Sequence, residues 1–148
     1  MIIVIGLFIL ITFIFIIAFV AITESEIAAP LQSTSNMTAD TYLDQVNRLL
    51  QDANADNGAL LVEKYACIAC HRLDVSNKIA PSFEGVSKRA ATRRPRLTAA
   101  AYLYESIINP TIYVVAGYQP AMPQDYAERL SDQELGDIIA YLLTPAAH

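Results

Sequence analysis

The sequence predicts an all-α protein, and three observations lead to that fold class. Apolar residues recur at helical spacing in several segments after residue 38. Capping residues stand where such segments begin, as in Ser131-Asp132-Gln133-Glu134, which has the pattern of a capping box. No segment alternates apolar and polar residues convincingly, as a half-buried strand would. With 148 residues, the chain has room for one folded domain and an extension.

The extension is predicted to be a membrane anchor. Residues 2–22 contain no charged side chain, and Thr12 is the one polar residue among them. As a helix this segment would span roughly 32 Å, which matches a hydrocarbon core of about 30 Å. The alternative is a cleaved signal peptide, but the segment has no basic n-region and exceeds the usual apolar length of about 7–15 residues. We therefore expect an uncleaved transmembrane helix within residues 1–22.

Residues 23–53 are predicted to connect this anchor to the folded domain. Residues 23–38 lack apolar periodicity and are expected to form a tether. From residue 39 to residue 53, a helical stripe predicts an amphipathic helix that is additional to a minimal domain. The stripe consists of Tyr42, Leu43, Val46, Leu49 and Leu50. Its apolar face needs a cover, which either the domain itself or another subunit would provide.

Residues 54–148 are expected to form the folded domain. Helices are predicted over three ranges, 59–66, 99–108 and 132–143. Thr98 and Ser131 are the expected N-caps of the second and third of these helices. The long loops 72–97 and 110–130 join the three helices. A loop of this length inside a compact domain usually has a function.

The central motif is Cys67-Ile68-Ala69-Cys70-His71. Two cysteines separated by two residues and followed by histidine form the attachment signature of a c-type haem, whose iron the histidine binds. A zinc site would need four ligands, but the chain has no third cysteine and only one more histidine, His148. The motif could also form a structural disulfide or a thioredoxin-like dithiol, but the βαβ pattern of a thioredoxin is absent. The motif indicates one haem c bound covalently through Cys67 and Cys70, with His71 as an iron ligand.

A second iron ligand is expected on the opposite face of the haem. The candidates are Met1, Met37, Met122 and His148. Met122 lies between Pro120 and Pro123 in a predicted loop, whereas the others lie in the anchor, the tether and the C-terminal tail. A lone methionine is more often core filler, but the two prolines exclude burial within a helix. We expect Met122 to bind the iron, which would raise the reduction potential and leave no open coordination position.

The charged residues are distributed unevenly. The net charge is −5, yet residues 64–96 carry eight lysines and arginines against two acidic residues. This basic segment suggests either a docking surface for a partner or a merely solvated face, and its cations could also neutralise haem propionates. Binding of nucleic acid is not expected.

Residues 54–144 resemble the class I cytochrome c family. The haem motif is similar, and Ala80-Pro81-Ser82-Phe83-Glu84-Gly85-Val86 resembles the family's Gly-Pro-x-Leu-x-Gly-Val segment, with Ala80 in place of the usual glycine. The resemblance implies that the carbonyl group of Pro81 accepts the ring N–H of His71, and that Ala121-Met122-Pro123 carries the distal ligand. It also implies that helix 135–142 crosses the first helix of the domain near Gly58.

Within this family, the segment Ser106-Ile107-Ile108-Asn109-Pro110 and the single apolar anchor are similar to membrane-tethered cytochromes of respiratory complexes. The resemblance implies an electron-transfer subunit of an oxidoreductase complex, most like the monohaem subunit of the quinol-oxidising alternative complex III. The cytochrome c subunits of nitric oxide reductase and of haem-copper oxidases are alternatives. The expected partners are subunits of a membrane respiratory or photosynthetic complex, a neighbouring haem or soluble electron carrier, and membrane lipid.

The expected location is the bacterial cytoplasmic membrane, with the haem domain on the periplasmic side, because haem is attached to such motifs there. Two further functions stay open. One is a haem enzyme or ligand sensor in which Met122 is displaceable, although no distal histidine or acid–base pair supports it. The second is a structural membrane subunit with a vestigial haem.

Overall fold

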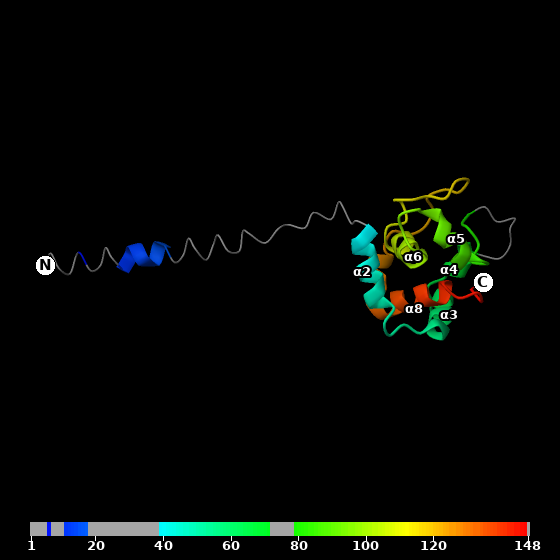
Figure 1. The fold of residues 1–148 in the computed structure, drawn as a ribbon, viewed down its shortest axis with the longest axis horizontal. Coiled ribbons are helices and arrows are strands. Elements are labelled where there is room, and N and C mark those ends of the chain that lie inside the picture. The colour runs from blue at the N-terminus through cyan, green and yellow to red at the C-terminus, as the bar shows by residue number, and fades with distance from the viewer. Residues whose placement is uncertain (1–5, 7–10, 18–38, 72–78, 148) are drawn as a thin grey trace. The chain divides into compact units, whose positions relative to one another are not determined.

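The computed structural model describes residues 6, 11–17, 39–71 and 79–147. The chain divides into two units, Met1–Asn36 and Met37–His148. In the first unit, residue 6 and residues 11–17 are helical (Figure 1). None of the helices among the described residues combines the length and the apolar character needed to cross a membrane. Most of the expected anchor, and all of the tether over residues 23–38, lie outside the described residues.

The described part of the second unit is all-helical and contains no strand (Figure 1), as the sequence predicted. Its helices are α2 (Ala39–Leu49), α3 (Ala55–Lys64), α4 (Cys67–Cys70), α5 (Val86–Arg93), α6 (Ala99–Ile108), α7 (Tyr126–Arg129) and α8 (Asp132–Leu142). Helices α3 and α8 form the most extensive contact between any two of these helices. Helix α6 packs against α2, α5 and α8.

Hydrogen bonds at helix ends fix the contact between α3 and α8. The Asn54 side chain caps α3, and Ser131 and Glu134 form the capping box predicted for α8. Asp137 of α8 exposes 1% of its surface and accepts hydrogen bonds from the backbone N–H of Asn54 at 2.7 Å and from the side-chain amide of Asn57 at 2.6 Å. The buried carboxylate therefore joins α8 to the beginning of α3.

The apolar face of α2 is covered by the domain itself. Tyr42, Val46 and Leu49 are buried, and the ring of Tyr42 lies 5.7 Å from that of Tyr104 on α6. At Gly136 of α8, a Cβ atom would lie 2.3 Å from the backbone oxygen of Leu49, so only glycine permits this approach. The additional helix is thus part of the same unit as the helices that follow it. It ends at Leu49, earlier than the predicted residue 53.

One helix has the predicted boundaries, another begins earlier than predicted, and two helices lie within predicted loops. Helix α6 coincides with the predicted range and has Thr98 as its N-cap. Helix α3 begins at Ala55 rather than at residue 59, because Asn54 caps it. Helices α5 and α7 lie within segments predicted to be loops. In α5 the one buried residue is Ala90, so no apolar stripe in the sequence marks this helix.

Candidate haem site

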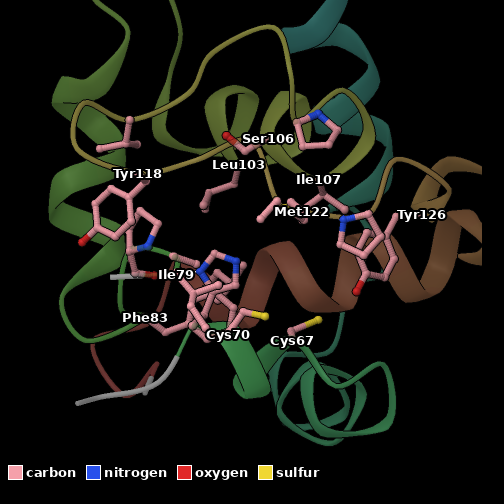
Figure 2. A pocket seen from close by; sticks show the side chains of 18 of the residues that line it. Cys67, Cys70, Ile79, Phe83, Leu103, Ser106, Ile107, Tyr118, Met122 and Tyr126 are labelled. Atoms are coloured by element: carbon pink, nitrogen blue, oxygen red, sulfur yellow. Dashed lines mark hydrogen bonds between the residues drawn. The ribbon is translucent and has the colours of Figure 1, made fainter. Parts of the chain in front are cut away.

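A cavity of about 490 Å³ lies between α4, α6 and the loop that follows α6. Its volume is within the range of cofactor sites, roughly 300–1,000 Å³. Cys67, Cys70, His71 and Met122 all line it, and apolar side chains such as Leu103 form much of the remaining wall (Figure 2). The described domain therefore brings the predicted ligands of the haem and its iron around one space.

The two cysteines lie on the single turn of α4. The backbone N–H of His71 donates to the carbonyl oxygen of Cys67 at 3.0 Å, which closes the turn. Residues three apart on a helix share a face, so Cys67 and Cys70 lie near the same side of the cavity. Ala66, which precedes the turn, has φ 56°, a left-handed conformation that non-glycine residues adopt at a cost of about 1–2 kcal/mol. Both thiols are free and half-buried, so no disulfide joins them.

The imidazole of His71 is held in a defined orientation. Its Nδ1 atom lies 2.7 Å from the carbonyl oxygen of Pro81. Because a carbonyl oxygen only accepts hydrogen bonds, Nδ1 carries the proton and the lone pair of Nε2 is free. Burial lowers the pKa of His71, while the hydrogen bond to Pro81 acts in the opposite direction, and the net shift favours the neutral ring. A neutral imidazole with a free Nε2 is the form that binds iron.

Phe83 also orients this imidazole. The two rings are stacked, with centroids 4.6 Å apart and planes inclined by 4°. Phe83 exposes 6% of its surface, and its backbone N–H donates to the carbonyl oxygen of His71 at 3.3 Å. Phe83 belongs to segment 80–86, which resembles the family, but no sequence pattern indicates that its ring stacks on His71. Sequence reasoning therefore missed Phe83 as part of the site.

Arg89 of α5 forms hydrogen bonds with the segment that follows Pro81. The guanidinium group of Arg89 donates hydrogen bonds to the backbone carbonyl oxygens of Ser82 and Glu84. Gly85, with φ 64°, turns the chain into α5. Arg89 belongs to the basic segment for which the sequence suggested docking or propionate contacts. In the structure its side chain is engaged within the domain.

Met122 lies in the Met122 loop, defined as residues 110–123 between α6 and α7. The side chain is half-buried and packs against the hydrophobic core. Figure 2 shows Met122 together with Leu103 and Ile107 on one side of the cavity, with Cys67 and Cys70 on the opposite side. The remaining candidates for the second ligand, Met1, Met37 and His148, lie outside the described residues.

Tyr126 of α7 is a further wall residue that the sequence reasoning missed. It exposes 7% of its surface, and its hydroxyl group donates to the carbonyl oxygen of Tyr65 at 3.3 Å. Burial raises the pKa of the Cys67 thiol. The guanidinium carbon of Arg129 lies 5.1 Å from the Tyr126 ring centroid. This cluster packs beside Cys67, where one thiol would bind the haem.

The donor set agrees with a haem better than with a metal ion held by side chains alone. In the described part of the chain, no three His, Cys, Asp or Glu side chains gather as a metal ion such as zinc would require. The cavity instead offers two thiols at one edge, an imidazole with a free Nε2, and a thioether on the opposite side, with largely apolar walls. These groups fit the attachment and axial ligation of a haem c.

Comparison with known families decides the assignment. The cytochrome c family matches residues 55–145. The chain belongs to the cytochrome c family. Membership implies a haem c bound covalently at the paired cysteines, Cys67 and Cys70, and haem-based electron transfer. The matched residues of this cytochrome c include α3 to α8 and every described residue that lines the cavity, whereas α2 precedes them.

Relatives of this cytochrome c occur in Rickettsia. A cytochrome c homolog of Rickettsia conorii is 27% identical over 132 residues, an alignment that covers 77% of this chain and 71% of the relative. Cytochrome c homologs of Rickettsia felis and Rickettsia bellii are each 26% identical over 113 residues, covering 67% of this chain and 61% of the relative. This cytochrome c therefore spans less than two thirds of the latter two proteins. No solved structure matches the chain significantly.

Proposed function

We propose that this cytochrome c is a membrane-anchored relay, which passes single electrons within a quinol-oxidising respiratory or photosynthetic complex similar to alternative complex III. A bound haem c supplies reversible one-electron chemistry at its iron. The chain's own residues have the remaining tasks. Cys67 and Cys70 attach the group, His71 and Met122 hold the iron, and the apolar wall excludes water.

The observation that carries this proposal is that the two candidate iron ligands, His71 and Met122, line one cavity. Pro81 accepts a hydrogen bond from Nδ1 of His71, and the ring of Phe83 stacks on one face of the imidazole. Neither contact uses Nε2, so the lone pair of that atom is free to bind iron. Met122 lies across the cavity from the cysteines (Figure 2). With His71 and Met122 both holding the iron, two protein ligands would be present in both oxidation states. Such a centre rearranges little on electron transfer and offers no site to a substrate.

The cavity wall also favours a relay over a haem enzyme or a ligand sensor. Among the described residues that line it, there is no carboxylate and no histidine besides His71. An enzyme that activates a small molecule at iron would need a group of this kind to move protons. The polar groups of the wall are instead tyrosine hydroxyls, Ser106, Gln119, Arg129 and the two thiols.

The absorption spectrum of the purified ferric protein tests this proposal. A relay should be low-spin, with a methionine–iron charge-transfer band, and its ferrous form should not react with carbon monoxide. A high-spin ferric spectrum, or rapid binding of carbon monoxide, would contradict the relay and favour an enzyme or sensor in which Met122 is displaceable.

The membrane anchor and the host complex belong to the same proposal. They are supported by the uncharged segment over residues 2–22 and by the resemblance of residues 106–110 to membrane-tethered cytochromes. The haem domain would lie on the periplasmic side of the bacterial cytoplasmic membrane. A cytochrome c subunit of nitric oxide reductase or of a haem-copper oxidase is the alternative assembly.

Extraction from membranes tests the anchor and the complex together. The full-length protein should stay in the membrane fraction after a high-salt wash, and removal of residues 1–22 should release it. After extraction in mild detergent, mass spectrometry of copurifying proteins should find subunits of a quinol-oxidising complex. Recovery of the full-length protein in the soluble fraction would contradict the anchor, and copurification of oxidase or nitric oxide reductase subunits would replace the preferred complex.

A further inference from the structure

The Met122 loop has few hydrogen bonds to hold it in place. Its backbone hydrogen bonds are local: Ile112 to Asn109 at 3.1 Å, Tyr118 to Val115 at 3.1 Å, and Ala121 to Gln119 at 2.8 Å. In the described part of the protein, no backbone hydrogen bond from residues 110–123 reaches beyond Asn109 at the end of α6. Among the described residues, side-chain contacts are therefore what connects the rest of this loop to α6.

Tyr113 provides that packing on the side of the loop towards α6. Its ring meets the ring of Tyr102 of α6 edge-on, with centroids 6.0 Å apart and planes inclined by 79°. Tyr102 exposes 8% of its surface, and both tyrosines line the cavity. The guanidinium carbon of Arg94 lies 5.3 Å from the centroid of the Tyr113 ring, within the range of a cation–π contact. Tyr113 thus has contacts with both Tyr102 and Arg94.

Arg94 forms an ion pair with a buried carboxylate. Glu105 of α6 has a side chain that is 4% exposed, and Nη1 of Arg94 lies 3.0 Å from its Oε1 atom. Burial raises the pKa of Glu105, and the charge of Arg94 opposes that shift. Among the described residues, Arg94 is the ion-pair partner of Glu105, and a buried charge is costly without one. Glu105 therefore holds the guanidinium group where it can contact Tyr113.

We propose that Arg94 is a positioning residue for the Met122 loop. It connects Glu105, on the side of α6 that does not line the cavity, to Tyr113 in the loop. Through this contact it holds the loop against α6, and so holds Met122 beside the cavity. The claim that Arg94 positions the loop does not depend on a metal. The claim that Arg94 influences the iron rests on the proposed function, in which Met122 binds the iron.

Hydrogen exchange of the haem-loaded, full-length protein in detergent tests the proposal. Comparing Arg94→Met/Glu105→Gln with the wild type removes the guanidinium group without leaving a buried unpaired charge. The hydrogen-bonded amides of Ile112, Tyr118 and Ala121 should exchange about 5- to 30-fold faster in the double variant, as expected for a lost contact of about 1–2 kcal/mol. Amides of α3 and α8 serve as the internal reference and should change by less than about twofold, because the contact is local.

Two variants of Tyr113 supply a matched pair. Tyr113→Leu removes the ring and should accelerate exchange in the loop to a similar extent, while Tyr113→Phe keeps the ring face and should stay within about twofold of the wild type. Unchanged exchange in the loop of the Arg94 double variant and of Tyr113→Leu would overturn the proposal. Equal acceleration in α3 and α8 would overturn it too, because Arg94 would then contribute to general stability rather than to the position of the loop.

The iron provides a second readout. If the Met122 loop opens more readily, the methionine–iron band of the ferric protein should disappear on alkaline titration at a lower pH, by about 0.7–1.5 units for a 5- to 30-fold change. If hydrogen exchange in the loop is faster but the pH at which the methionine–iron band disappears is unchanged, the claim that Arg94 affects iron binding by Met122 is wrong. A wild-type protein without that band would refute the proposed axial pair, and the exchange experiment would still decide whether Arg94 positions the loop.

Discussion

A Cβ atom on Gly58 would lie 2.0 Å from the carbonyl oxygen of Asp137, so helices α3 and α8 meet backbone to backbone at this point. Glycine is required here by the close approach and not by an unusual φ. The crossing matters for the site because α3 ends at Lys64, shortly before Cys67 begins α4. The contact between α3 and α8 therefore helps to determine where the haem motif lies.

Replacing Gly58 by alanine should destabilise the domain. The added methyl group collides with backbone atoms and with Cβ of Tyr141 at 2.7 Å, so the two helices must move apart. Overpacking of this kind costs about 1–3 kcal/mol of unfolding free energy. Denaturant unfolding followed by circular dichroism would measure it, with Glu63→Ala at an exposed position of α3 as the control. Equal stability of the two variants would show that the crossing is not tight.

Asp137 should make the stability of the domain depend on pH. Burial raises the pKa of its carboxyl group, but hydrogen bonds from Asn54, Asn57 and Gln133 together lower it by more, so the folded-state pKa lies below the usual value. Asp137 therefore stabilises the fold above about pH 4, the unfolded-state pKa, and this contribution is lost as the pH falls through the folded-state pKa.

The variant Asp137→Asn tests this dependence. At neutral pH it should lower the unfolding free energy by about 1–3 kcal/mol, because buried donors lose their charged acceptor. Below about pH 4 the difference from the wild type should shrink. Urea unfolding over this pH range would measure both effects, with the exposed Asp44→Asn as the control. A difference that stays constant with pH would contradict the prediction.

Met122→Leu should remove the second iron ligand while keeping an apolar side chain of similar volume. The methionine–iron charge-transfer band should disappear completely, the ferrous protein should bind carbon monoxide, and the reduction potential should fall, since a methionine ligand raises it. Absorption spectroscopy and redox titration would measure these changes. Met37→Leu, in the predicted tether, is the matched control and should behave as the wild type. An intact band in Met122→Leu would show that another residue binds the iron.

The exposed cations of α5 and the segment after it should attract anionic electron donors. Two arginines of the basic segment are engaged within the domain: Arg89 donates hydrogen bonds to backbone carbonyl oxygens, and Arg94 forms an ion pair with Glu105. The structure therefore reduces the number of cations that could attract a partner. Lys88 and Arg96 remain exposed, and α5 contributes Val86 to the cavity wall. Among the described cations of α5 and the segment after it, these two are the exposed ones, so their charges can steer a donor towards the site.

The double variant Lys88→Glu/Arg96→Glu should slow reduction by ferrocyanide a few-fold at about 0.01 M ionic strength, where the Debye length is about 30 Å. The difference should vanish near 1 M salt, where that length is about 3 Å. Stopped-flow measurements would test this, with Arg48→Glu as the control, because Arg48 is exposed on α2 and no residue of α2 lines the cavity. A rate that does not change with ionic strength would exclude steering by these residues.

Several features could be predicted because their causes are local. The capping box of α8 and the cap of α6 depend on residues three apart, and both appear in the structure as expected. The haem motif is equally local, since covalent spacing alone places two thiols beside a histidine. Helix α5 escaped prediction because its packing depends on Ala90 and not on an apolar stripe.

The surroundings of the site could not be predicted, because they depend on contacts between distant segments. Nothing in the sequence pairs Phe83 with His71 by ring stacking, or Arg94 with Glu105 by charge. Likewise, the sequence left the cover of α2 open between the domain and another subunit, and packing of Tyr42 on Tyr104 assigns it to the domain.

By itself the sequence determined the all-α class, the attachment motif and the candidate ligands, because each is a pattern of residue types at short spacing. Only the tertiary structure decided which of the described cations are exposed and which are paired, and that Tyr113 of the Met122 loop packs against Tyr102 of α6. These outcomes follow from burial, since a charge or an aromatic ring acquires its role from the groups that exclude water around it.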